Sequence, residues 1–316
     1  MLLMPETQNS ENKPAGKLSL KQRIYDIYDK QYKILSLITV FLLIISVGYL
    51  TYNYITTGDL FKKDISLSGG ITITIPLEKE INVKQLSSDL SRDIKKDVSI
   101  RQLSSGGKQS GLIVEINSKE NNPDEVDKII AEIEKASTEK IGVDYSVEFI
   151  GSSLGASFFN EVARSLIIAF IAMAIVVILY FRLFVPSIAV IFAAFTDIAI
   201  TLAVVNIMGM RIGTAGIAAL LMLIGYSVDT DMLLTTRVMK RKEGSVMDRV
   251  MDSVKTGMKM TLTTLGALTV GLIFTNSDTI KQIMIIIFIG LLVDMLATWF
   301  TNVGILRYYL EKKGIK

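Results

Sequence analysis

The sequence contains neither cysteine nor histidine in its 316 residues. Without cysteine the chain can form no disulfide and no thiolate metal site, and without histidine it lacks imidazole ligands, catalytic Cys/His pairs and histidine proton relays. Proton chemistry must therefore run on carboxylates, with help from lysine, arginine or tyrosine. Nothing in the sequence indicates a bound metal, a cofactor or a nucleophile–base pair, so we expect that the protein is not an enzyme.

Apolar residues, by contrast, make up 50% of the chain, and the mean hydropathy is +0.44. A soluble protein of this length rarely buries so many apolar side chains, whereas lipid covers them in a membrane protein. A transmembrane helix needs about 20 mostly apolar residues. We predict six transmembrane helices, at residues 34–55, 162–181, 183–208, 212–236, 257–275 and 282–306.

Basic residues are concentrated in three segments outside these spans: the tail 1–33, the connection between the fourth and fifth spans, and the tail 307–316. The connections on the opposite side hold only Arg211 and Lys281. Cytoplasmic loops of membrane proteins are enriched in lysine and arginine. We therefore predict a multi-pass protein of the plasma membrane, with both termini in the cytoplasm and residues 56–161 outside.

Residues 56–161 show alternating strand and helix patterns. We predict strands at 71–75, 98–103, 112–116 and 145–149, a turn at 104–107, and helices at 83–96 and 123–135. The order βαββαβ is that of the ferredoxin-like fold. The expected fold is a polytopic α-helical membrane protein with an α+β ferredoxin-like extracytoplasmic domain between the first two spans. Its mildly acidic composition and external location argue against a nucleic-acid partner.

Four aspartates lie within the predicted spans, where ionisable groups are costly and rarely accidental. At a rise of about 1.5 Å per residue, Asp197 in the third span and Asp294 in the sixth fall near mid-membrane. Asp229 and Asp231 lie in the cytoplasmic half of the fourth span, with Asp231 nearer the aqueous boundary. At 3.6 residues per turn they point to nearly opposite sides of their helix, so at most one faces the bundle interior squarely.

Two residues near the cytoplasmic boundary allow alternative interpretations. Asp231 either takes part in function, or snorkels to water or pairs with a loop arginine. Lys259 opens the fifth span at about the same depth, where it either pairs with Asp231 or extends to the membrane interface. A buried aspartate beside a mobile lysine can change its protonation as helices move. Asp197, Asp229, Asp231, Asp294 and Lys259 are therefore the candidate proton-coupling residues.

The fourth span contains the segment Ile-Gly-Tyr-Ser-Val-Asp-Thr-Asp at residues 224–231. This segment resembles the fourth-span motif of the SecF branch of the SecD/SecF family, whose members are membrane subunits of the protein-export machinery. Residues 67–71, Leu-Ser-Gly-Gly-Ile, resemble the Gly-Gly motif that begins the family's outer domain, and residues 195–197, Phe-Thr-Asp, are similar to its third-span motif. The motif residues are Gly225, Tyr226, Ser227, Thr230, Arg237, Gly69 and Gly70.

Three positions depart from the bacterial pattern of the family. The functional aspartate of bacterial members aligns with Thr230, which here lies between two aspartates; Lys259 stands in place of an arginine, and Thr196 in place of a histidine. The Asp-Thr-Asp version is similar to that of the archaeal branch. These departures leave open which aspartate carries protons and whether proton coupling holds. Because Asp229 lies deeper, we expect Asp229→Asn to impair export more than Asp231→Asn.

The resemblance implies an RND-type membrane fold that works with a larger homologous partner, SecD, beside the SecY channel complex. Proton flow would then assist the translocation of unfolded exported polypeptides. Two other functions stay open: a stand-alone RND-like transporter of lipids or small hydrophobic molecules, and a sensor or scaffold with a ligand-binding outer domain. Co-purification with SecD and SecY would favour the export role over the transporter, and function that survives neutralisation of all four aspartates would favour the scaffold.

Overall fold

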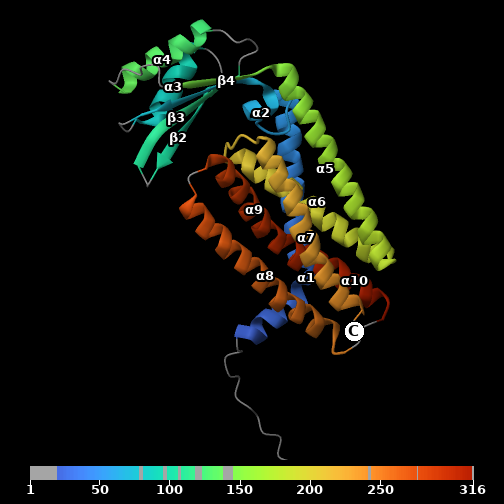
Figure 1. Cartoon of the computed structure of the whole chain (residues 1–316). Coiled ribbons are helices and arrows are strands. Elements are labelled where there is room, and N and C mark those ends of the chain that lie inside the picture. Colours follow the sequence, from blue (N-terminus) through green and yellow to red (C-terminus); the bar gives the residue numbers. More distant parts are fainter. Residues whose placement is uncertain are drawn as a thin grey trace, which may run out of the picture.

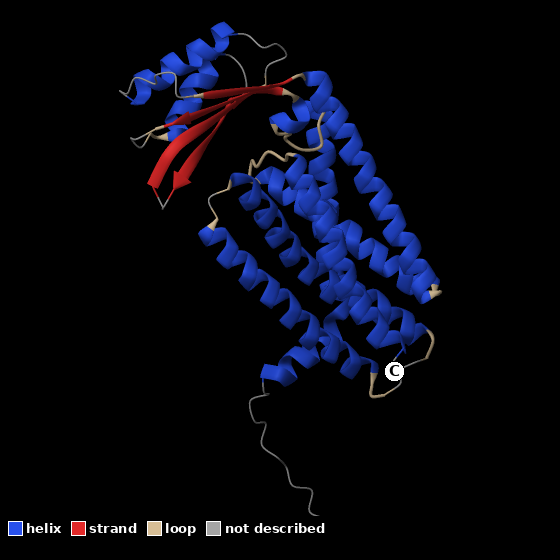
Figure 2. Ribbon diagram, in the orientation of Figure 1, coloured by secondary structure: helices blue, strands red, loops and turns tan. Residues whose placement is uncertain are grey.

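Long apolar helices form most of the molecule, and a small α+β domain lies at one end of them (Figures 1 and 2). The computed structural model describes residues 20–77, 81–94, 98–105, 108–117, 123–137, 145–240, 243–275 and 277–314. Within these residues, six helical stretches are long and apolar enough to cross a membrane. The predicted number of spans is therefore confirmed.

The helices of the bundle extend beyond the predicted spans. They are α1 (Leu20–Thr57), α5 (Ser152–Phe181), α6 (Phe184–Ile207), α7 (Thr214–Lys240), α8 (Val246–Phe274) and α9 (Asp278–Leu296), which continues through the π-helix η1 (Ala297–Asn302) into α10 (Val303–Lys312). Helix α8 begins early because Ser245 and Asp248 form a capping box at its N-terminus. Its first turns then bury Val246 and Val250 in a cluster with residues of α10.

The spans divide into central and peripheral helices. About half or more of the residues are buried in the apolar windows of α6, α7 and the α9–α10 stretch, but few are buried in those of α1, α5 and α8. Small residues such as Ala193 and Ala194, which are buried in α6, permit the close approach of the central helices. Any group carried on the inner faces of α6, α7 and α9 is thus removed from lipid.

A four-stranded antiparallel sheet forms the small domain, which we call the sheet domain. Its strands are β1 (Gly70–Pro76), β2 (Val98–Ser105), β3 (Lys108–Ile116) and β4 (Ser146–Ile150), in the order β2-β3-β1-β4. Alternation in β1 buries Ile71, Ile73 and Ile75 in one core with residues of α3 (Val83–Ile94) and α4 (Pro123–Ser137). Both helices lie on one side of the sheet, and its other side is turned towards the bundle (Figure 2).

The predicted strands and helices of this domain all occur, with ends that differ by a few residues. The predicted turn at 104–107 is only partly covered, because Gly106 and Gly107 lie outside the described residues.

A short segment, residues 58–69, joins α1 to β1 and attaches the sheet domain to the bundle; we call it the junction. The backbone N–H of Asp64 donates to the carbonyl of Ile212 at 3.0 Å, and the N–H of Ile212 donates to the carbonyl of Lys62 at 2.8 Å. Asp64 also caps the short helix α2 (Ile65–Ser68). Ile212 lies just before α7, so these two hydrogen bonds join the junction to the start of a central helix.

Candidate functional site

Three aspartates from the three central helices meet inside the bundle. Asp197 on α6, Asp231 on α7 and Asp294 on α9 are each 0% exposed. One carboxylate oxygen from each lies within 4.8 Å of the other two. We call these three residues the carboxylate cluster.

Hydroxyl and amide donors hold the cluster in place. Ser227 Oγ donates to Asp197 Oδ2 at 2.5 Å, and Asn302 Nδ2 donates to Asp231 Oδ1 at 2.7 Å. The Thr298 hydroxyl lies 2.9 Å from Asp231 Oδ1 and also 2.9 Å from Asp294 Oδ1. Because a hydroxyl carries one proton, Thr298 can donate to only one of the two carboxylates at a time.

The π-helix η1 brings two of these donors to the cluster. Thr298 and Asn302 both lie in η1, which begins three residues after Asp294. A π-helical turn shifts the register of a helix and is frequent at functional sites. From α1, Ser36 Oγ lies 2.8 Å from the carbonyl oxygen of Phe300 in η1 and 2.9 Å from that of Tyr32, so its single proton can be donated to the irregular turn.

The three carboxylates of the cluster could carry three negative charges, and the described side chains around them supply no positive charge to balance these. In the part of the chain that the structure describes, none of the three carboxylates forms an ion pair, and Asp197 Oδ1, Asp231 Oδ2 and Asp294 Oδ2 have no hydrogen-bond partner. Three ionised carboxylates this close, away from water, repel one another strongly. Protons shared among the carboxylates, or a cation held by their oxygens, would relieve the repulsion.

Of the four predicted aspartates, Asp229 is the one outside the cluster. It is exposed on the opposite side of α7, on the same face as Met222 and Tyr226. Of the two alternatives for Asp231, the one in which it turns to the aqueous boundary or to a loop arginine was wrong, since Asp231 is fully buried and bonded to η1. Helical spacing correctly separated the two aspartates but did not show which of them faces inward.

The basic residues near the Lys240 end of α7 do not reach the cluster. Lys259 is exposed on α8 and forms no ion pair with a described side chain, so the alternative of a Lys259–Asp231 pair was wrong. Arg237 donates to the carbonyl of Asp252 at 2.9 Å and to Thr256 Oγ1 at 2.8 Å. It therefore fastens α7 to α8 and does not neutralise Asp231.

The other motif residues have several structural roles. Ser227 belongs to the site through its bond to Asp197, whereas Thr230 is buried near Gly257 on a different side of α7. Gly225 and Tyr226 are exposed on the Asp229 face. Gly69 and Gly70 lie where the junction enters β1, and a Cβ on Gly69 would lie 2.5 Å from the Cα of Ser152 in α5. The Gly-Gly motif thus permits close backbone packing.

Sequence reasoning missed Thr298 and Asn302. With Asp294 they are spaced four residues apart, and residues at i and i+4 share one face of a helix. This stripe of polar residues in an apolar span was the available signal.

The comparisons with known proteins agree with this architecture. The chain matches the family model "Protein export membrane protein SecD/SecF, C-terminal" over residues 129–312. The "Protein-export membrane protein SecF" of Pyrococcus furiosus is 38% identical over 265 residues, which are 83% of this chain and 85% of the relative. The SecF of Methanocaldococcus jannaschii is 36% identical over 293 residues, which are 91% of this chain and 99% of the relative.

A solved structure shows the same fold. The crystal structure of SecDF, a translocon-associated membrane protein from Thermus thermophilus, matches with a TM-score of 0.70 at 17% identity. The match covers 92% of this chain and 42% of that chain. From the family match and the identity to archaeal relatives, the chain belongs to the SecF branch of the SecD/SecF family of protein-export membrane proteins.

Proposed function

We propose that the chain assists Sec-dependent export of unfolded polypeptides as the SecF-type partner of a SecD homologue, beside the SecY channel complex. In this proposal protons bind to and leave the carboxylate cluster, and the chain is not an enzyme. The observation that carries the proton coupling is the meeting of three fully buried carboxylates, from three helices, with no ion pair to a described cation. Buried ionisable groups inside membrane proteins commonly mark ion and proton pathways.

The proposed orientation places both termini in the cytoplasm and the sheet domain outside. The distribution of lysine and arginine among the connections supports it. We further propose that the sheet domain is ferredoxin-like. The strand order β2-β3-β1-β4 and the two helices on one side of the sheet support that assignment.

Proton binding can move helices because it changes the repulsion among Asp197, Asp231 and Asp294. When the cluster loses a proton, α6, α7 and α9 are pushed apart, and Thr298 changes the carboxylate to which it donates. Helix α7 begins next to Ile212, which is hydrogen-bonded to the junction. A small displacement of α7 therefore reaches the sheet domain, where it would act on the exported chain.

The exposed face of α7 that carries Asp229 favours the proposal that a membrane-embedded partner packs against it. A carboxylate that faces lipid at the depth of Asp229 is costly. Met222, Gly225 and Tyr226 are exposed on the same face. A SecD homologue packed against this face would remove Asp229 from lipid, so we assign Asp229 to assembly and Asp231 to proton transfer.

The test compares Asp231→Asn with Asp229→Asn in vesicles that contain the chain with its SecD homologue and the SecY complex. We expect Asp231→Asn to lose most of the export that depends on a proton gradient, at least about tenfold, because one proton site of the cluster is removed. Asp229→Asn should retain more of that export. The greater depth of Asp229 in its span predicted the opposite ranking of the two variants.

Co-purification of the SecD homologue with each variant supplies the control. Asp231→Asn should co-purify normally, because its side chain lies inside the bundle. Export rates that fall equally in the two variants, with assembly intact in both, would contradict the assignment of proton transfer to the cluster.

A further inference from the structure

Three buried polar atoms at and around Asp231 have no hydrogen-bond partner in the described part of the chain. They are Asp231 Oδ2, Asn302 Oδ1 and Thr235 Oγ1, and each of the three residues is 0% exposed. Asp231 and Asn302 are in direct contact, through the hydrogen bond of 2.7 Å from Asn302 Nδ2 to Asp231 Oδ1. Buried polar atoms in proteins nearly always have a partner, so these three indicate a small bound molecule.

Thr235 lies beside the same pair because of its position on α7. It follows Asp231 by four residues, and residues at i and i+4 share one face of a helix. Helix α7 and the stretch α9–α10 run in the same direction away from the sheet domain (Figure 1). Val238, on the same face of α7, belongs to one apolar core with Val303 of α10. The face that carries Thr235 is therefore turned towards Asn302.

The hydroxyl of Thr235 is available because it is not bonded to the backbone. A buried threonine in a helix can donate to the carbonyl four residues earlier, as Thr196 does to Phe192 at 2.8 Å. Thr235 Oγ1 makes no such bond. The three atoms thus comprise two acceptors, Asp231 Oδ2 and Asn302 Oδ1, and one hydroxyl that can either donate or accept.

We propose that Asp231, Thr235 and Asn302 bind one buried water molecule, through which protons pass between the carboxylate cluster and the Lys240 end of α7. A buried water typically makes about three hydrogen bonds to groups that otherwise have no partner. When Asp231 is ionised, the water donates to Asp231 Oδ2 and Asn302 Oδ1 and accepts from Thr235. The inference rests on the proposed function, and it makes Asp231 the member of the cluster that exchanges protons with this end of the bundle.

The same groups can relay a proton without a net change in the water or the hydroxyl. A protonated Asp231 donates to the water, which then donates to Asn302 Oδ1 and Thr235 Oγ1. The proton of Asp231 moves to the water oxygen, a water proton moves to Thr235, and the original hydroxyl proton leaves towards Lys240. The water and the hydroxyl are restored, and Asp231 is left with its negative charge.

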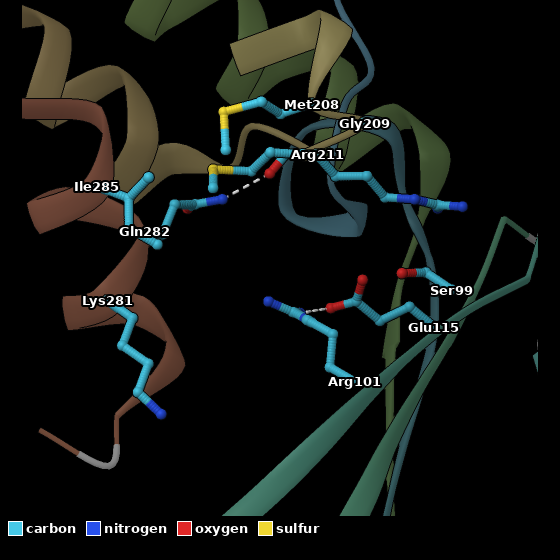
Figure 3. Close-up of a pocket in the computed structure, with 10 residues that line it drawn as sticks. Ser99, Arg101, Glu115, Met208, Gly209, Arg211, Lys281, Gln282 and Ile285 are labelled. Carbon is cyan, nitrogen blue, oxygen red and sulfur yellow. Dashed lines mark hydrogen bonds and ion pairs between the residues drawn. The ribbon is translucent and has the colours of Figure 1, made fainter. Parts of the chain in front are cut away.

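The opposite side of the cluster is closed by apolar residues. A cavity at the sheet-domain end of the bundle is lined in part by Ile285, which precedes Asp294 on α9 by about 14 Å of helix (Figure 3). Ile287 and Leu291 lie in between and belong to a buried apolar cluster with residues of α6 and α7. Thr235, by contrast, lies only about 8 Å of helix from the end of α7. The shorter way from the cluster therefore leads to the Lys240 end.

The lack of native cysteine allows a direct test of the water in the purified full chain. Thr235→Cys introduces a single thiol, and infrared spectroscopy follows its S–H band after transfer to D₂O. Ala219→Cys is the matched control, because Ala219 is 0% exposed in the apolar cluster on the same helix. We expect exchange to be at least about tenfold faster in Thr235→Cys, since exchange at Ala219→Cys requires the bundle to open.

Equal exchange rates in the two cysteine variants, whether fast or slow, would overturn the water site. Sodium is the other small species that these oxygens could bind. A melting temperature that rises with sodium chloride but not with choline chloride, and does so only when Thr235 is present, would assign the three oxygens to a sodium ion. Thr235→Val supplies the comparison for that measurement.

Thr235→Val and Thr235→Ser test the relay in the vesicles used for Asp231→Asn. Valine removes the hydroxyl, so gradient-dependent export should fall about tenfold because the water loses one of its three partners. Serine retains the hydroxyl and should restore most of the export. Ser187→Ala is the control, since it removes a buried hydroxyl that donates to the carbonyl of Leu183 at 2.8 Å.

The same vesicles separate the failure of the relay from the failure of the proposed function. Normal export in Thr235→Val, with export lost in Asp231→Asn, would overturn the relay alone. Normal export in both variants would overturn proton transfer at the cluster and the relay with it. Equal losses in Thr235→Val and Thr235→Ser would show that the hydroxyl does not carry the proton.

Discussion

The hydroxyl of Thr298 is the donor that two of the three buried carboxylates share. Thr298→Val keeps the shape of the side chain but leaves one more carboxylate oxygen without a donor. Removing one partner of a buried hydrogen bond costs about 1–3 kcal/mol. We expect a lower melting temperature in detergent and slower export, and a smaller effect of Thr298→Ser, which retains the hydroxyl. Valine and serine variants that melt and export alike would show that the hydroxyl does not matter.

Single residues also show how far the sequence alone could predict the site. The presence of Asp197, Asp231 and Asp294 at membrane depth was predictable, because charged residues in apolar spans are conspicuous. Their meeting was not, because it depends on how three helices that are distant along the chain rotate about their axes. The same rotation decides that Asp231 faces inward and Asp229 outward, and helical spacing fixes only the angle between them.

The π-helix η1 is the element on which the donors of the site depend. Trp299 in η1 packs against Gly257 in α8, where an added Cβ would lie 2.3 Å from Trp299 Cζ2. Gly257→Ala should therefore displace Trp299 and the turn that carries Thr298. We expect a loss of about 1–3 kcal/mol in stability, typical of overpacking, together with slower export.

Gly266 in the same helix provides the matched control for Gly257. A Cβ on Gly266 meets no heavy atom within 4 Å. Alanine favours a helix over glycine by about 1 kcal/mol, so Gly266→Ala should melt at the same temperature or higher. If Gly257→Ala behaved in the same way, the contact between Trp299 and Gly257 would not hold η1 in place.

At the scale of elements, patterns of period two and of 3.6 residues predicted the strands and helices of the sheet domain, since β1 and α3 each bury one face. Hydropathy predicted the six spans because each span is a long run of apolar residues. Neither signal could predict η1, because one extra residue in a helical turn leaves the apolar composition unchanged. The irregular turn in the last span is in contact with Ser36 and Gly257, which belong to other helices and are distant along the chain.

For the molecule as a whole, proton binding in the bundle can assist export only if the sheet domain responds to it. The two parts meet where the junction contacts Ile212 and where Gly69 packs against α5. Backbone hydrogen bonds and close backbone packing transmit small displacements better than flexible side chains do. We therefore expect that loosening the junction uncouples export from the proton gradient without changing the carboxylate cluster.

Two glycines of the junction allow this expectation to be tested. Gly58 and Gly69 have nearly the same φ, +80° and +79°, but a Cβ on Gly58 meets nothing within 4 Å, whereas one on Gly69 lies 2.5 Å from the Cα of Ser152. A positive φ is strained for alanine at either position, and more so at Gly69, whose ψ of 161° places it in a region that essentially only glycine adopts. Gly69→Ala adds the collision with α5, so hydrogen exchange should increase in α2 and in the first turns of α5.

Gradient-dependent export should fall in Gly69→Ala but persist in Gly58→Ala. Equal export in the two variants, with faster exchange in Gly69→Ala alone, would show that the sheet domain receives its motion by another route.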